Sequence, residues 1–394
     1  MSIPVKWFTN NMRGAPTLSG TPGALIALLD ACLITGFGPV TPTGITIAGG
    51  IATATLPSGQ SFDEHAVVLV SGATPATLNG EARVLTSSST QITFATTASD
   101  GAASGSIEIR YAPVGGWEKK FSGTNLAVYR STDAQSNGHH LRVDDAGTTT
   151  ARVRGFETMT DVNTGAGPFP TDAHMSGGGY WHKSTQANAT PVRWRLFADS
   201  RMVLLAVAAG TAASGTMLAA PLRGFGEPIA LRPSGDAWGT VLACGGSVAG
   251  QANFGALDVN VVGGTANGMV ALPRAVVGLG GSINTVNAPL VGINSTVLSG
   301  NDPTLGVFPS DVDGQLKLCR RFIRETAANN GPRSLVPGLL HVPQSGLVSV
   351  VSDGDIVIGQ GDLAGRRLMA IHTGTSYASG AVGVYFVDIT GPWR

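Results

Sequence analysis

Residues 45–56 read ITIAGGIATATL, and this stretch decides the expected fold class. Apolar and small polar residues alternate on both sides of Gly49-Gly50, which is the period of two expected of a β-strand with one buried face. Paired glycines readily adopt the positive φ angles that a two-residue hairpin turn requires. The stretch therefore predicts a β-hairpin with strands at 45–48 and 51–56.

Similar signals surround this hairpin and predict a small β domain. Short runs rich in β-branched residues recur over residues 67–111, and Asn79-Gly80 has the composition of a tight hairpin turn. Such a density of short strands is typical of a sandwich or a small barrel. We therefore expect an immunoglobulin-like sandwich or a barrel over residues 42–113.

Residues 114–394 predict a larger antiparallel β domain, so the whole chain is expected to be mostly β. The Asp353-Gly354 pair marks a further hairpin turn. Stretches rich in glycine, alanine, serine and asparagine at 245–255 and 276–301 predict long, irregular loops. The candidate strands of this domain are 126–130, 193–197, 202–208, 239–243, 257–262, 347–351, 356–358, 368–372 and 382–389.

Residues 1–41 predict an N-terminal arm followed by a buried helix. The apolar run at 24–34 can be capped at its start by Ser19 or Thr21, and Gly36 suits its end. A charged residue interrupts the run, which argues against a secretion signal. Because the helix is apolar nearly all round, it is expected inside the protein or against another subunit. The candidate assembly residues on it are Leu25, Leu28 and Leu29.

The charge content points to an assembly. Charged residues make up 13% of the 394 residues, against about 25% in an average soluble domain, while 43% are apolar and 55 are glycine. Charge keeps molecules apart in solution, so this surface is expected to be covered by other subunits. The formal net charge of zero predicts no direct binding of nucleic acid, and no apolar run is long enough for a membrane span.

The motifs that imitate catalytic sequences fail at the residues that the chemistry needs. Residues 177–184 resemble the end of a phosphate-binding loop, but His182 stands where that motif requires glycine. Residues 359–364 resemble a dinucleotide fingerprint, but a strand-like run follows where a helix is required. We therefore predict that the chain is not an enzyme and that it carries no cofactor and no metal.

Two pairs of adjacent titratable residues are not expected to form a metal site. His139-His140 is expected in a surface turn, because adjacent side chains on a strand would point to opposite faces and would not chelate one ion. Asp144-Asp145 offers carboxylates but lacks the spacing of a calcium loop.

Positive charge is concentrated at residues 315–324, after the turn-like segment DVDG at 311–314. A solvated or salt-bridged edge is the favoured interpretation, and contact with phosphate or an acidic neighbour is the alternative. On a helix, one face would hold Lys317, Arg320, Arg321 and Arg324.

The aromatic triplet Tyr180-Trp181-His182 is the candidate binding site. It follows three glycines, which predicts large rings on a flexible, exposed loop of the kind that recognises sugars or proteins. The alternative is that Trp181 closes over the core. Trp194, flanked by arginines in a predicted strand, is expected in the core.

Several segments resemble a family of tailed-bacteriophage virion proteins, and together they extend over most of the chain. The resemblance is based mainly on the opening and closing segments, and the segments between them fit the same pattern. The segments are Ile3–Phe8, Gly14–Pro16, Gly20–Gly23, Leu28–Cys32, Val70–Pro75, Leu78–Glu81, Gly116–Lys119, Arg142–Asp145, Gly235–Trp238 and Val387–Trp393.

The resemblance implies a structural subunit of a phage tail, in the baseplate or tail-tip region. Such a subunit would be assembled in the host cytoplasm and would reside in the virion, with copies of itself and other tail or baseplate proteins as partners. The alternative is a receptor- or glycan-binding tail-fibre module, with a host-surface glycan as partner and Tyr180 and Trp181 as contacts. The resemblance carries over no catalytic residue.

Overall fold

The hairpin predicted at residues 45–56 is present in the computed structural model as β3 (Gly44–Ala48) and β4 (Ile51–Thr55). Gly49 and Gly50 join the strands with φ angles of 58° and 78°. Alternate residues of β3 are buried and exposed, which is the two-sided pattern that predicted the strand.

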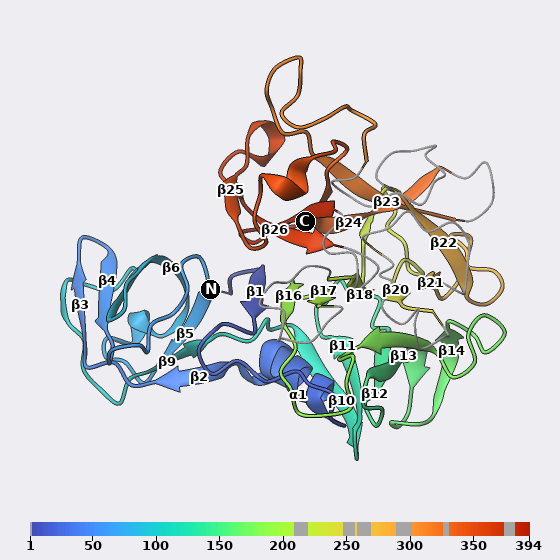
Figure 1. Ribbon diagram of the computed structural model, residues 1–394. Coiled ribbons are helices and arrows are strands. Elements are labelled where there is room, and N and C mark those ends of the chain that lie inside the picture. Colours follow the sequence, from blue (N-terminus) through green and yellow to red (C-terminus); the bar gives the residue numbers. More distant parts are fainter. Residues whose placement is uncertain are drawn as a thin grey trace.

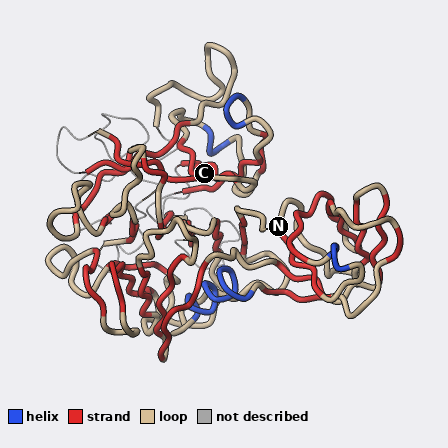
Figure 2. Tube along the Cα trace, turned by 180° about the vertical axis from the view of Figure 1, so that it is seen from behind, coloured by secondary structure: helices blue, strands red, loops and turns tan. Residues whose placement is uncertain are grey.

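The described residues form three antiparallel β-sheets and little helix, so the predicted mostly-β fold class is confirmed. Figure 1 shows the N-terminal sheet as a lobe to one side of the other two. Figure 2 shows the same arrangement from behind, with a few short helical segments among the strands. The structure describes residues 2–208, 220–246, 257, 269–288, 302–325, 331–373 and 383–394.

The first sheet bends over on itself at one strand. The first half of β6 (Gly80–Ser87) pairs with β5, and its second half pairs with β7 after a register shift at Val84. A short 3₁₀ helix, η2 (Ala76–Leu78), lies in the connection before β6. The strands in spatial order are β2 (Phe37–Val40), β9 (Glu108–Tyr111), β5 (Val67–Ser71), β6, β7 (Gln91–Ala95), β4, β3 and β8 (Gly101–Ala102).

The second sheet has six strands and lies beside the N-terminal helix (Figure 1). β13 (Thr150–Met159) pairs with three neighbours because it is long enough to hold β14 and β15 along one side. The remaining strands are β10 (Trp117–Gly123), β11 (Leu126–Ser131), β12 (His140–Asp144), β14 (Gly165–Phe169) and β15 (Gly179–His182).

The third sheet has thirteen strands and begins with the N-terminal strand of the chain. β1 (Lys6–Thr9) pairs with β16, and β25 (Ile356–Ile358) is the last strand at the other end. Between them lie β16 (Trp194–Ala198), β17 (Met202–Val207), β18 (Leu222–Gly226), β20 (Val241–Cys244), β21 (Met269–Leu272), β22 (Ile283–Ala288), β23 (Cys319–Glu325), β24 (Pro332–His341), β27 (Gly383–Asp388) and β26 (Arg367–Thr373), with β19 (Ile229–Ala230) beside β24.

Arg83 of the first sheet joins the two ends of the chain. Its guanidinium donates to the backbone oxygens of Ile389 at 3.0 Å, Thr390 at 3.2 Å and Val5 at 3.3 Å. The predicted N-terminal segment 1–41 is thus divided among three places: β1 in the large sheet, the helix against the second sheet, and β2 in the first.

Lys6 makes a second junction between the sheets. Its buried ammonium donates to Glu81 Oε1 at 2.7 Å and to the carbonyl oxygens of Pro113 at 2.6 Å and Val114 at 2.7 Å. Burial lowers the pKa of Lys6, and the charge of Glu81 opposes that effect. A charge taken out of water in this way is tolerated because each donor has an oxygen partner.

The N-terminal helix covers the expected residues, but only its first half is α-helical, and it is capped from a distance. It comprises α1 (Ala24–Leu29), continued by a π-helical turn, η1 (Asp30–Thr35). The expected caps are wrong, because Ser19 and Thr21 bond to each other at 2.9 Å and no local side chain caps the helix. Gly36 ends it with a positive φ of 71°, as expected of the residue after the helix.

Three other predictions in loops are wrong. Asn79 is extended, so the β5–β6 connection is a longer loop and Asn79-Gly80 is not its tight turn. Residues 347–349 form a 3₁₀ helix, η4 (Leu347–Ser349), where a strand was expected; η5 (Gly361–Leu363) is a further one. The expected loop at 276–301 contains β22. The predicted strand at 257–262 and most of the loop at 245–255 lie outside the described residues.

The distant cap of α1 is a buried ion pair from the second sheet. Asp145 Oδ2 accepts the backbone N–H groups of Leu25 at 2.7 Å and Ile26 at 3.1 Å. Its Oδ1 is paired with Lys183 Nζ, which also donates to the Thr21 carbonyl at 2.9 Å. Both charged side chains are 0% exposed. One carboxylate therefore satisfies a helix terminus and a buried cation together.

We expect Asp145→Ala to lower the free energy of unfolding by about 3–5 kcal/mol, because it leaves a buried ammonium and two helix N–H groups without their hydrogen-bond acceptor. Denaturant unfolding measures the loss. The control is Asp144→Ala, whose carboxylate lies 3.8 Å from Arg142 at a partly exposed position, with an expected loss below about 1 kcal/mol. Equal losses for the two variants would contradict the capping role.

Candidate functional site

The aromatic triplet lies in a strand and not on an exposed loop. Trp181 is 0% exposed, and its indole N–H donates to the Ala243 carbonyl at 2.9 Å. His182 is also buried, while Tyr180 is half-buried with the Arg152 guanidinium 4.0 Å from its ring centroid. The prediction of an exposed aromatic loop is therefore wrong, and the alternative that placed Trp181 in the core is confirmed.

The glycine before this triplet serves close packing and not flexibility. A Cβ atom on Gly179 would collide with the sulfur of Cys244 on the neighbouring sheet. Gly245 meets Tyr180 through backbone hydrogen bonds of 2.8 and 3.4 Å. The second and third sheets thus approach each other closely here, which the sequence pattern of three glycines did not distinguish from a mobile loop.

The three candidate assembly leucines belong to the core of their own chain. Leu25, Leu28 and Leu29 are each 0% exposed, so in this fold they are not available to a neighbouring subunit. Trp194 is likewise 0% exposed, as predicted. Burial of such large apolar side chains stabilises the single subunit.

The two adjacent histidines are buried and not in a surface turn. His139 is 6% and His140 is 5% exposed. His139 Nδ1 lies 2.7 Å from the Thr240 hydroxyl, and its ring stacks on Trp238 with 6.1 Å between centroids. Burial lowers the pKa of His139 to about 4, so this side chain is neutral near pH 7.

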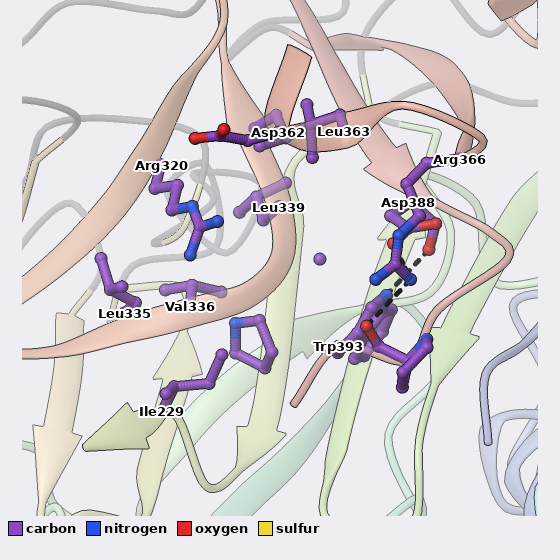
Figure 3. Close-up of a pocket in the computed structure, with 14 residues that line it drawn as sticks. Ile229, Arg320, Leu335, Val336, Leu339, Asp362, Leu363, Arg366, Asp388 and Trp393 are labelled. Carbon is purple, nitrogen blue, oxygen red and sulfur yellow. Dashed lines mark hydrogen bonds and ion pairs between the residues drawn. The ribbon is translucent and has the colours of Figure 1, made fainter. Parts of the chain in front are cut away.

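Two adjoining hollows open in the C-terminal lobe, which we define as residues 302–325, 331–373 and 383–394 around β23–β27. The smaller, of 110 Å³, lies between β24 and the chain end (Figure 3). The larger, of 880 Å³, lies between residues 314–318 and 357–363, with mostly apolar walls. Both are lined by Arg320, Leu340, Asp362 and Leu363.

The two arginines that line the smaller hollow differ in their hydrogen-bond and ion-pair partners. Arg366 donates to the Pro392 carbonyl at 2.9 Å and lies 3.3 Å from Asp388, at one side of the smaller hollow (Figure 3). Arg320 points in from the other side (Figure 3), and within the described residues its guanidinium has no hydrogen-bond or ion-pair partner. A mostly apolar hollow that holds one guanidinium and, at Asp362, one carboxylate suits an apolar group with a charge placed beside Arg320.

The basic segment that contains Arg320 is a strand, so the expected helix face of four cations is wrong. Along β23, Arg320 is exposed, whereas Arg321 is 0% exposed because successive side chains of a strand point to opposite faces. The sequence did single out this segment, but the assumed helical period hid the one residue that faces the hollows.

A buried polar network fixes the loop in front of β23. His341 Nε2 lies 2.8 Å from Asp302 Oδ2, and its Nδ1 lies 3.2 Å from Arg321 Nη1. Burial lowers the pKa of His341 to about 4. A neutral imidazole that donates from Nε2 and accepts at Nδ1 satisfies both neighbours.

The described residues contain no group of three or more His, Cys, Asp or Glu side chains placed to hold a metal ion. Within the same ranges, none of the helices has the length and apolarity needed to cross a membrane.

We expect Trp181→Ala to lower the free energy of unfolding by about 3–5 kcal/mol, because it empties an enclosed indole site. Denaturant unfolding tests this, with the half-buried Tyr180→Ala as the control that loses less. If Trp181→Ala unfolds like the wild type, the indole contributes nothing to the core and this burial is wrong.

Four buried histidines predict loss of stability in mild acid. Burial lowers the pKa of His182 to about 3, well below the value of about 6.5 in an unfolded chain. The unfolded state therefore binds the proton first, so stability is complete above about pH 6.5 and falls as the pH drops toward 4. His139, His140 and His341 add to the effect, because burial lowers the pKa of each.

We expect the drop in unfolding free energy between about pH 7.5 and about pH 5 to shrink by about 2 kcal/mol in His182→Gln. Unfolding curves at the two pH values measure it, with His174→Gln as the control outside the core. An unchanged drop in His182→Gln would show that this histidine is not the group that titrates.

No protein-family model matches this chain, and none of the curated proteins compared with it has significant sequence similarity.

Proposed function

We propose that the chain is a structural subunit of a bacteriophage tail, in the baseplate or tail-tip region, that acts through contacts with its own copies and with other tail proteins. It works without catalysis and resides in the virion after assembly in the host cytoplasm. The likeness of its opening and closing segments to tailed-phage virion proteins supports this proposal.

The observation that carries the proposal is a gathering of exposed apolar side chains on the C-terminal lobe. Among the described residues, six of the eleven exposed large hydrophobic side chains fall within residues 305–358. Exposed apolar patches rimmed by polar groups mark interaction surfaces. With only 13% charged residues, the chain has little charge to keep this surface apart from others. We call it the lobe patch: Leu305, Val307, Val312, Val350, Ile356 and Ile358.

The glycan-binding alternative has less support in this fold. Its contacts were to be Tyr180 and Trp181, but the Trp181 ring is enclosed and the Tyr180 ring carries Arg152 on one face. A sugar needs an open aromatic face to stack on. The surface that stands open is aliphatic, which suits protein contacts better.

We expect an antibody against this chain to label tails of intact particles of the phage that encodes it. A nonsense mutation in its gene should give particles with incomplete tails, because neighbouring subunits lose the surface on which they assemble. Electron microscopy and infectivity measure both effects, with the gene supplied in trans as the control. Complete, infectious particles that lack the chain would overturn the proposal.

A further inference from the structure

The lobe patch contains a projecting apolar tip between two carboxylates. Val312 is 93% exposed, the highest value among the exposed large hydrophobic residues of the described chain. It sits in a tight turn that Gly314 closes by donating its N–H to the Ser310 carbonyl at 2.7 Å. Asp311 and Asp313 flank it on the surface. We call residues 310–314 the knob.

The carboxylates of the knob differ in their partners. Asp313 is paired with Lys317 of its own chain. Asp311 is exposed, and among the described residues its side chain has no hydrogen-bond or ion-pair partner. The knob therefore presents one apolar side chain and one free negative charge.

The larger hollow beside the knob has the complementary properties. Its walls are mainly apolar and include Leu316, Leu318 and Leu340, and its charged lining residues are one cation, Arg320, and one carboxylate, Asp362. Gly314, which ends the knob, also lines this hollow. Projection and recess thus share an edge on a single face of the lobe.

We propose that this face binds a second copy of the same chain, with the knob of each copy in the larger hollow of the other. In this contact Val312 enters the apolar recess, and Asp311 lies against the partner's Arg320. The inference rests on the proposed function as an assembling subunit and names the surface and the partner for it.

A second copy fits better than an unrelated partner because both halves of the contact are on one patch. A two-fold interface requires a self-complementary surface, in which each residue of one copy meets its complement on the other. Knob and hollow meet that requirement because an exposed apolar tip adjoins an apolar recess, and because Asp311 is opposite in charge to Arg320 in that recess. The formal net charge of zero adds no long-range repulsion between copies.

Sedimentation velocity over a series of protein concentrations tests the contact. The wild type should form dimers, and Val312→Ser, Arg320→Glu and Asp311→Lys should each weaken the dimer by about tenfold or more. The double variant with Asp311→Lys and Arg320→Glu restores opposite charges across the interface and should return to within about threefold of the wild type. Thermal unfolding checks that each variant stays folded.

The matched control is Val277→Ser, because Val277 is 70% exposed in a loop outside the lobe patch. It should leave the dimer unchanged. A mixture of the Asp311→Lys chain with the Arg320→Glu chain should form dimers that neither forms alone, since each pairing across the interface then joins opposite charges.

A wild type that stays monomeric at every concentration would overturn the proposed contact, as would a dimer that Val312→Ser and Arg320→Glu leave unchanged. Either result leaves the tail assignment standing if antibody labelling places the chain in the particle. Crosslinks from the knob to a different tail protein, with no crosslinks between copies, would show that the partner is not a second copy.

Discussion

The fold depends most on the buried pair of Asp145 and Lys183. The pair holds the N-terminal helix against the second sheet, because one carboxylate oxygen caps the helix and the other binds the ammonium. In an apolar interior neither charge is tolerable without the other. A helix this short is marginal by itself and takes its place from such tertiary contacts. The leucines of α1 can then be fully enclosed.

Much of the fold could be predicted from the period at which apolar residues recur in the sequence. The predictions that failed did so for physical reasons. Alternation and the positive-φ glycines identified β3 and β4 because those strands have one buried and one open face. The cap of α1 could not be predicted, since Asp145 lies about 120 residues from the N–H groups it binds. The prediction of a tight turn at Asn79-Gly80 failed because the composition of this pair suits such a turn, whereas the connection between β5 and β6 that contains Asn79 is longer.

The candidate site was harder to predict because the exposure of a side chain depends on segments that are distant in the sequence. Glycines before Trp181 suggested mobility, whereas at Gly179 the absence of a side chain lets two sheets touch. The basic segment was noticed, but only the strand alternation of β23 separates exposed Arg320 from buried Arg321. The turn that projects Val312 resembled a common Asp-Gly turn, and the neighbouring hollow forms only where residues 308–320 meet residues 340–368 of the same chain.

The order of strands in the large sheet has a consequence for synthesis of the protein. β27 (Gly383–Asp388), the final strand of the chain, lies between β24 and β26. Until it leaves the ribosome, both neighbours present open edges, which are templates for pairing with other chains. The lobe therefore cannot close until β27 has been synthesised, and a chain truncated before β27 would be prone to aggregate.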